Sequence, residues 1–334
     1  MIGRRWLGCF VLVTGLIGLV GSRAFVQAGD DKAKWEWKAF DKNKDKKYDP
    51  FYQILSTKTN QTMKVADMEI KQEQNQQFYV KWTPSEPDKD GNWVVTQQII
   101  GVKMDIDIGG NKITYDSTGQ QPPKNPMSEF FDALQKAELK FYIKPADFSI
   151  VKIEGAEEFR KKLSTANPQI SKLLDNILSE PSLKQMAEPT WQAFPTEKVR
   201  AEKEFKDKGT WKKTNTLDLG PIGIYDFTNT YTVGKDTKVT IESDVEYKVQ
   251  TKDAKKEGLP FVIKSGKLKT KKGEGYAQFD KDRGRFKDSK LDMTLEGDLS
   301  IDIGGMVTDV RLTQTQNSTV VTQDENPLEK KKGQ

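Results

Sequence analysis

Four aspartates have the spacing that could most readily support catalysis. Asp105 and Asp107 are two positions apart and Asp298 and Asp302 are four apart, so each pair shares one face of an extended strand. Paired carboxylates can hydrolyse a glycosidic bond or bind a hard cation. Acids at alternate positions are also the ordinary composition of a strand face that meets water. We favour the second interpretation and keep a carboxylate-dependent hydrolase as an alternative.

The residue types that are missing exclude other chemistries. The 334 residues include no histidine and a single cysteine, Cys9. The chain therefore lacks the commonest proton shuttle and transition-metal ligand, and one cysteine cannot form an internal disulfide. No glycine-rich phosphate loop is present, because Gly273-Glu-Gly275 has no third glycine. We predict no catalytic residue, no metal ligand and no cofactor.

One segment begins like a calcium-binding loop. Asp41-Lys-Asn43-Lys-Asp45 has the first three oxygen donors of such a loop. The sixth position should be glycine and the twelfth a bidentate glutamate, but the chain has Lys46 and Tyr52 there. We interpret the segment as a solvated polar stretch.

Two periodicities predict the elements that position these residues. Apolar and polar residues alternate through 104–108, 239–249 and 291–303. Alternation over this length is typical of an antiparallel sheet with one dry and one wet face, and long strands must twist and curve. Short echoes link the two halves: Asp-Ile-Gly-Gly ends both 104–110 and 299–305. These echoes predict two similar β lobes.

The middle of the chain changes to helical spacing. Asn125-Pro126 and Asn167-Pro168 each look like an N-cap followed by proline in the first helical turn. A helix starting at Gly155 places Phe159 on an apolar face, and a short helix follows Pro181. Each helix has one apolar side and must pack against another element.

Aromatic side chains are the best candidates for a binding site. They crowd the first half of the chain, and core packing is their simplest use. A surplus on the concave side of a curved sheet, capped by the helices, would instead form an apolar groove or cavity. The residues that we predict to line it are Phe78, Trp82, Trp93, Phe159 and Leu174.

The N-terminus has the three parts of a secretory signal. Arg4 and Arg5 precede an apolar stretch over 6–20, and Val26-Gln27-Ala28 offers small or modest side chains before Gly29. The stretch is shorter than the ~20 residues that span a bilayer. We therefore predict cleavage near Ala28 and a periplasmic or extracellular protein, with a retained anchor as the alternative.

Charge gives little support for a nucleic-acid partner. The chain has 54 Lys and Arg residues and 49 Asp and Glu residues, which alternate along it. No basic stripe would follow a phosphate backbone, and the one basic run, Lys330-Lys331-Lys332, lies in a polar tail. The partners that we expect are a lipid or other apolar ligand, or an envelope protein.

Several turn motifs resemble those of an uncharacterised family of exported bacterial proteins, known only as a domain of unknown function. The resemblance implies a fold and an exported location but no reaction, cofactor or site residue. The segments that carry it are Met63-Lys-Val65, Asp90-Gly-Asn-Trp93, Gly101-Val-Lys-Met104, Ile108-Gly-Gly110, Tyr115-Asp-Ser117, Leu219-Gly-Pro-Ile-Gly223 and Gly258-Leu-Pro-Phe261.

Together these patterns predict an α+β fold, mainly a curved antiparallel sheet in two lobes with a helical insert. The expected divisions are a signal peptide (1–28), an N-terminal β lobe (29–144), a helical insert (145–200, with helices from about 125), a C-terminal β lobe (201–323) and a polar tail (324–334). The favoured function is a non-enzymatic envelope protein that binds a hydrophobic ligand on a concave sheet face. A structural or protein–protein module with a packed core is the alternative, and the hydrolase is a third.

Overall fold

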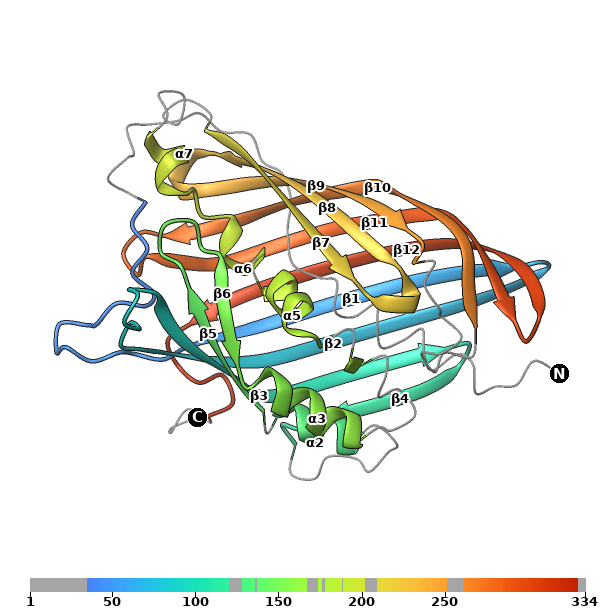
Figure 1. The fold of residues 1–334 in the computed structure, drawn as a ribbon, viewed down its shortest axis with the longest axis horizontal. Helices are drawn as coiled ribbons and strands as arrows, with labels where there is room; N and C mark the ends of the chain where they lie inside the picture. Colours follow the sequence, from blue (N-terminus) through green and yellow to red (C-terminus); the bar gives the residue numbers. More distant parts are fainter. Residues whose placement is uncertain are drawn as a thin grey trace.

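The fold is a single large antiparallel sheet with a few short helices (Figure 1). The structure is a computed structural model and describes residues 35–119, 128–135, 137–166, 174–175, 178–187, 189–201, 209–250 and 261–329. The signal sequence, the two Asn-Pro helix starts and the Lys330–Lys332 run lie outside these residues, so the predictions made for them are not tested.

Twelve strands form the sheet. In chain order they are β1 (Phe51–Val65), β2 (Met68–Ser85), β3 (Trp93–Ile108), β4 (Asn111–Asp116), β5 (Glu138–Ile143), β6 (Ile150–Glu154), β7 (Thr210–Asp218), β8 (Ile224–Val233), β9 (Lys238–Lys248), β10 (Val262–Asp280), β11 (Arg285–Ile303) and β12 (Met306–Gln323). Their order in the sheet is β6-β5-β3-β2-β1-β12-β11-β10-β9-β8-β7, and β4 pairs with β3. The prediction of a mainly antiparallel, curved sheet is confirmed.

The sheet is continuous from one half of the chain to the other. Strand β1 pairs with β12 without a register shift, from Tyr52 opposite Gln323 to Val65 opposite Val310. The strands before and after the helical segment therefore share one sheet. The division into two lobes remains a sequence prediction.

Five short helices lie in the middle of the described chain, between β4 and β7 in sequence. They are α2 (Ser128–Gln135), α3 (Ala156–Ala166), α5 (Glu180–Ala187), α6 (Pro189–Gln192) and α7 (Glu197–Ala201), with 3₁₀ turns η3 (Gly220–Ile222) and η4 (Lys235–Thr237) in the second half. Helix α3 begins directly after Gly155 and buries Phe159, as its spacing predicts.

Helix α5 touches both edge strands of the sheet, β6 and β7. The Lys184 ammonium donates to the carbonyl of Val151 in β6, with 2.8 Å between Nζ and O. On the other side, the Ser182 hydroxyl donates to the carbonyl of Asp218 in β7 at 3.5 Å. The sheet is thus curved strongly enough to bring its first and last strands to either side of one helix (Figure 1).

Alternation along the strands separates an inner face from an outer face. On β9, Val239, Ile241, Ser243, Val245 and Tyr247 are buried, whereas the residues that alternate with them are half-buried or exposed. Strand β11 does the same from Leu291 to Ile301. The predicted dry and wet faces are confirmed, and the dry face is the inner one.

The repeated Asp-Ile-Gly-Gly motif is explained by a shared turn. Gly109 and Gly110 both have positive φ (55° and 87°), as do Gly304 and Gly305 (59° and 94°). Each pair forms the two-residue loop of a hairpin, between β3 and β4 or between β11 and β12. A type I′ turn needs positive φ at both central positions, which glycine adopts without strain. The echo therefore reflects the same hairpin made twice.

Replacing Gly297 by alanine is expected to destabilise the sheet strongly. A Cβ at this position would lie 1.9 Å from the carbonyl oxygen of Lys267, so β10 and β11 would have to move apart. We expect the free energy of unfolding in urea to fall by about 2 kcal/mol or more. Gly119→Ala is the control, since its nearest neighbour is 4.0 Å away. Equal effects of the two substitutions would contradict the close packing of these strands.

Candidate functional site

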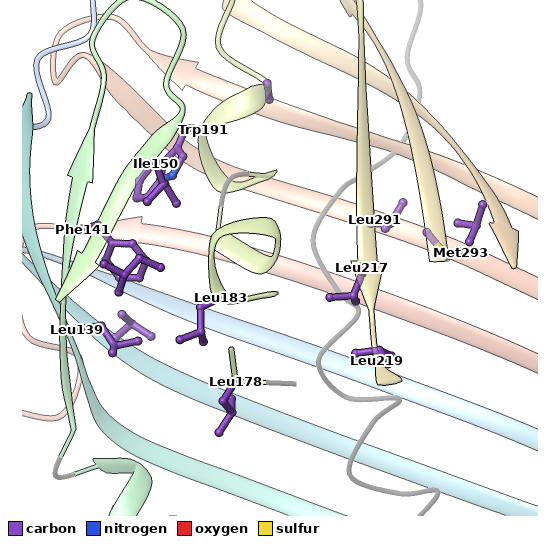
Figure 2. Close-up of a cluster of buried hydrophobic side chains, with 14 of the residues drawn as sticks. Leu139, Phe141, Ile150, Leu178, Leu183, Trp191, Leu217, Leu219, Leu291 and Met293 are labelled. Carbon is purple, nitrogen blue, oxygen red and sulfur yellow. The ribbon is translucent and has the colours of Figure 1, made fainter. Parts of the chain in front are cut away.

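An aromatic cluster fills one end of the inner face. The Trp82 ring on β2 stacks on Phe51 of β1, with ring centroids 6.3 Å apart, and meets the edge of Trp191 from α6 at 5.1 Å. Its indole N–H donates to the side-chain oxygen of Gln53 at 2.8 Å. The cluster thus joins the central strands to the helical segment. Figure 2 shows Trp191 near Ile150 of the edge strand β6 and Phe141 of its neighbour β5.

The N-terminal segment inserts into the same cluster. Phe40 meets Trp93 edge-on at 5.4 Å and Trp191 at 5.7 Å. Trp37 meets Phe148 at 5.3 Å and Phe194 at 5.4 Å. Residues distant in sequence therefore enclose this end of the interior from several sides.

Two tryptophans of the cluster bury an indole N–H that has no acceptor among the described residues. They are Trp37 and Trp191, which are 9% and 1% exposed. Trp211 shows the usual arrangement, because its indole N–H donates to the carbonyl of Gln192 at 3.1 Å. A buried tryptophan normally finds such a partner. The indole N–H groups of Trp37 and Trp191 thus depart from this arrangement.

The centre of the inner face is polar, unlike its surroundings. Strands β2, β1 and β12 each contribute three buried polar side chains, and their registers align them in three rows. We call these nine residues the polar grid. Its rows are Gln72–Gln61–Gln314, Gln74–Thr59–Gln316 and Gln76–Thr57–Ser318.

Apolar side chains surround the polar grid on all four sides. Along the strands, it is bounded by Met63, Ile70 and Leu312 at one end and by Leu55, Phe78 and Val320 at the other. Across the strands, its neighbours are Met104, Ile106 and Ile108 on β3 and Leu291, Met293 and Leu295 on β11. The grid is therefore an isolated polar area within an apolar interior.

Hydrogen bonds along the strands join the second row of the grid to the third. The Gln74 amide donates to Gln76 at 3.1 Å, and the Gln316 amide donates to the Ser318 hydroxyl at 3.2 Å. The side-chain amides of Gln61 and Gln72, which lie opposite each other, have no partner for either nitrogen or oxygen among the described residues. The Thr59 hydroxyl and the Gln74 amide oxygen also lack one there.

Buried polar groups without a hydrogen-bond partner lower the stability of the folded state. Burying a polar group without a hydrogen bond destabilises a fold by about 1–3 kcal/mol. Gln61, Gln72 and Thr59 are at most 2% exposed. A stable protein that carries several of them in one place has a reason to keep them, and a bound partner is one such reason.

The polar grid is not predicted by the sequence pattern. A polar run such as residues 71–77 is typical of a loop or an exposed strand, not of a buried face. One signal was present in the sequence: Gln72, Gln74 and Gln76 are an even number of positions from the aromatic residues Phe78 and Trp82. A period of two puts all of these residues on one face.

The predicted lining residues fall in two parts of the interior. Trp82 and Trp93 belong to the aromatic cluster, and the half-buried Phe78 borders the polar grid. Phe159 and Leu174 are buried in the helical part of the same core. All five contribute to one apolar interior, and their role in ligand binding remains a prediction.

The four aspartates lie on the outer face and do not converge. Asp105 and Asp298 are exposed. Asp107 and Asp302 close their hairpins, since the carboxylates accept the backbone N–H of Gly110 and Gly305 at 2.8 and 2.9 Å. These contacts favour a structural role.

The rest of the described chain has further features that bear on metal binding and on titratable groups. It has no group of three or more acidic, His or Cys side chains that could hold a metal ion. In the calcium-like segment, the Asn43 side-chain oxygen accepts the backbone N–H groups of Asp45 and Lys47 and so forms a turn. Burial raises the pKa of the inner-face phenols of Tyr231 and Tyr247, which keeps both neutral.

The profile of a protein family of unknown function, DUF6263, matches residues 90–326. The chain belongs to this family. The resemblance seen in the turn motifs is thereby confirmed, although Met63-Lys-Val65 precedes the matched region. Among curated proteins, none matches the sequence.

Similarity to solved structures is low. A lipovitellin structure titled for its lipid–protein interactions has a TM-score of 0.40 and 10% identity over 82% of this chain, which spans only 25% of that protein. OccK7 (OpdD) of Pseudomonas aeruginosa scores 0.21 at 7% identity, covering 82% of this chain and 99% of that one. A DUF1329 family protein from Desulfovibrio piger scores 0.15 at 9% identity, covering 78% and 83%. Scores this low do not assign a shared fold.

Within the described residues, every helix is too short or too polar to cross a membrane.

Replacing Asp302 by alanine is expected to lower stability. The substitution removes the acceptor for Gly305 and the ion pair with Lys264, whose Nζ lies 3.1 Å from the carboxylate. Because this carboxylate is only 8% exposed, we expect a loss of about 1–2 kcal/mol in urea unfolding. The exposed Asp298→Ala is the control and should change stability by less than about 0.5 kcal/mol. A neutral Asp302→Ala would contradict the structural role.

Proposed function

We propose that this protein is a non-enzymatic binding protein whose curved sheet takes up an apolar ligand on its inner face. The observation that carries the proposal is the pair of buried indole N–H groups of Trp37 and Trp191, which lack acceptors among the described residues. They lie in an aromatic cluster that could contact an apolar molecule while its polar atom accepts from an indole. The predicted lining residues Trp82 and Trp93 belong to the same cluster.

The shape of the sheet supports a role in enclosing a ligand. Helix α5 lies between the edge strands, and Figure 2 shows its Leu183 in the same buried cluster as Leu217 and the β11 residues Leu291 and Met293. Glu180, Lys184 and Ser182 bond this helix to the edge strands, and a movement of the helix would expose the interior. Both halves of the sheet would contribute to the binding face.

A packed structural module is the second candidate. The ring contacts around Trp82, Phe51 and Trp191 have centroid distances of 5.1–6.3 Å, which are normal for an aromatic core. In that case the inner face would serve stability alone, and the partner would bind elsewhere.

We also propose that the protein acts outside the cytoplasm. The charged, apolar and small-residue parts of the N-terminal sequence support this location. An exported carrier would meet lipids and other apolar envelope molecules.

Native mass spectrometry of the protein purified from its own host envelope tests the function directly. A reproducible additional mass of lipid size is expected, and it would identify the ligand class. A mass equal to that of the polypeptide alone, together with no fluorescence gain from an apolar dye, would contradict the binding function and favour the packed module.

Replacing Trp191 by phenylalanine is expected to weaken ligand binding. We suggest a solvatochromic naphthyl ketone as the probe, because its carbonyl can accept from the indole N–H. Loss of that bond should raise Kd by about tenfold. Trp211→Phe is the matched control: it loses an internal bond to Gln192, so it should lower stability and leave Kd unchanged. The same Kd change in both variants would speak against a ligand contact at Trp191.

A further inference from the structure

The polar grid carries information about the ligand that the aromatic cluster does not. Its nine side chains are amides and hydroxyls, and none carries a charge. Both the nitrogen and the oxygen of Gln61 and of Gln72 are buried and lack partners among the described residues, as does the Thr59 oxygen. The grid therefore offers donors and acceptors side by side.

The size of the grid also restricts what can cover it. Neighbouring strands are about 4.8 Å apart and alternate residues about 6.8 Å apart, so nine side chains span roughly 10 by 14 Å. This area exceeds a single carbonyl or hydroxyl group and suits a head group with several polar atoms. The apolar residues on all four sides would contact a hydrocarbon part attached to it.

The absence of charge in the polar grid distinguishes between neutral and ionised head groups as ligands. Burying an ionised head group is costly unless an opposite charge pairs with it, and the grid supplies none. A neutral head with hydroxyl or amide groups can both donate to and accept from glutamine side chains. The complementary ligand is therefore uncharged at its polar end.

We propose that the polar grid binds the head group of a neutral amphiphile that bears several hydroxyl or amide groups, such as a glycosylated or polyol-headed lipid. This inference rests on the proposed apolar-ligand function and specifies its ligand class. The unpartnered row Gln61–Gln72 and the Thr59 hydroxyl make the hydrogen bonds, and the surrounding apolar side chains hold the attached chain.

Three probes with the same twelve-carbon chain test the head-group preference in the full-length protein. They are dodecyl maltoside, laurate and dodecyltrimethylammonium, each below its critical micelle concentration and each used to displace a bound apolar dye. The maltoside should bind at least about tenfold more tightly than either charged probe. Equal affinities would overturn the inference and leave the proposed function standing. Failure of the dye itself to bind would overturn both.

The double variant Gln61→Leu/Gln72→Leu tests the residues. Removing buried amides that lack partners should keep or raise the melting temperature, since apolar side chains of similar size carry no desolvation penalty. The maltoside should lose about tenfold in affinity, whereas the apolar dye should bind as well as before. A lower melting temperature would show that the amides are bonded within the fold and would overturn the inference.

Gln53→Leu is the matched control on the same strand. Its amide is satisfied, because it accepts from the Trp82 indole at 2.8 Å and donates to the Thr322 hydroxyl at 3.2 Å. We expect this variant to lower the melting temperature and to preserve the preference for the maltoside. Equal behaviour of the control and the double variant would contradict a special role for the Gln61–Gln72 row.

Discussion

The pairing of β1 with β12 is the interaction on which the rest of the structure depends. These strands come from the two ends of the described chain, and their ladder runs from Tyr52 to Val65 without a register shift. A shift by one residue would turn every inner side chain of β1 outward. In the order of the sheet, strands β1 to β6 are joined to strands β7 to β12 through this ladder. The β1–β12 pairing therefore builds one inner face from two halves of the sequence.

The polar grid exists because of the same pairing. Its middle column is on β1 and one outer column is on β12, so neither half of the chain contains it alone. Burial of apolar area drives such a sheet to curve around its inner face. Burial of Gln61, Gln72 and Thr59 opposes that drive. Their burial is unfavourable for stability by itself, and we propose that recognition of a polar group offsets this cost.

Closure of the curved sheet is achieved by a helix instead of by strand pairing. Helix α5 lies between β6 and β7 and bonds to β6 through Glu180 and Lys184 and to β7 through Ser182. Alternating charged residues keep the outer face solvent-exposed. Their exposed ion pairs contribute little to stability. The stability of the fold therefore comes mainly from the strand ladders and the buried inner face.

The sequence by itself determined the alternating strands over 104–108, 239–249 and 291–303, their dry and wet faces, the glycine pairs of two turns and the family resemblance. These features are local: alternation over a strand and glycine pairs at a turn need no distant partner. The contact of α5 with both edges, the joining of β1 to β12 and the grid were decided only by the tertiary structure. The reason is that a polar side chain such as Gln72 has the same local pattern whether its face meets water or the core. Which of the two it meets depends on residues more than two hundred positions away, since Gln314 is brought beside Gln61 by pairing alone.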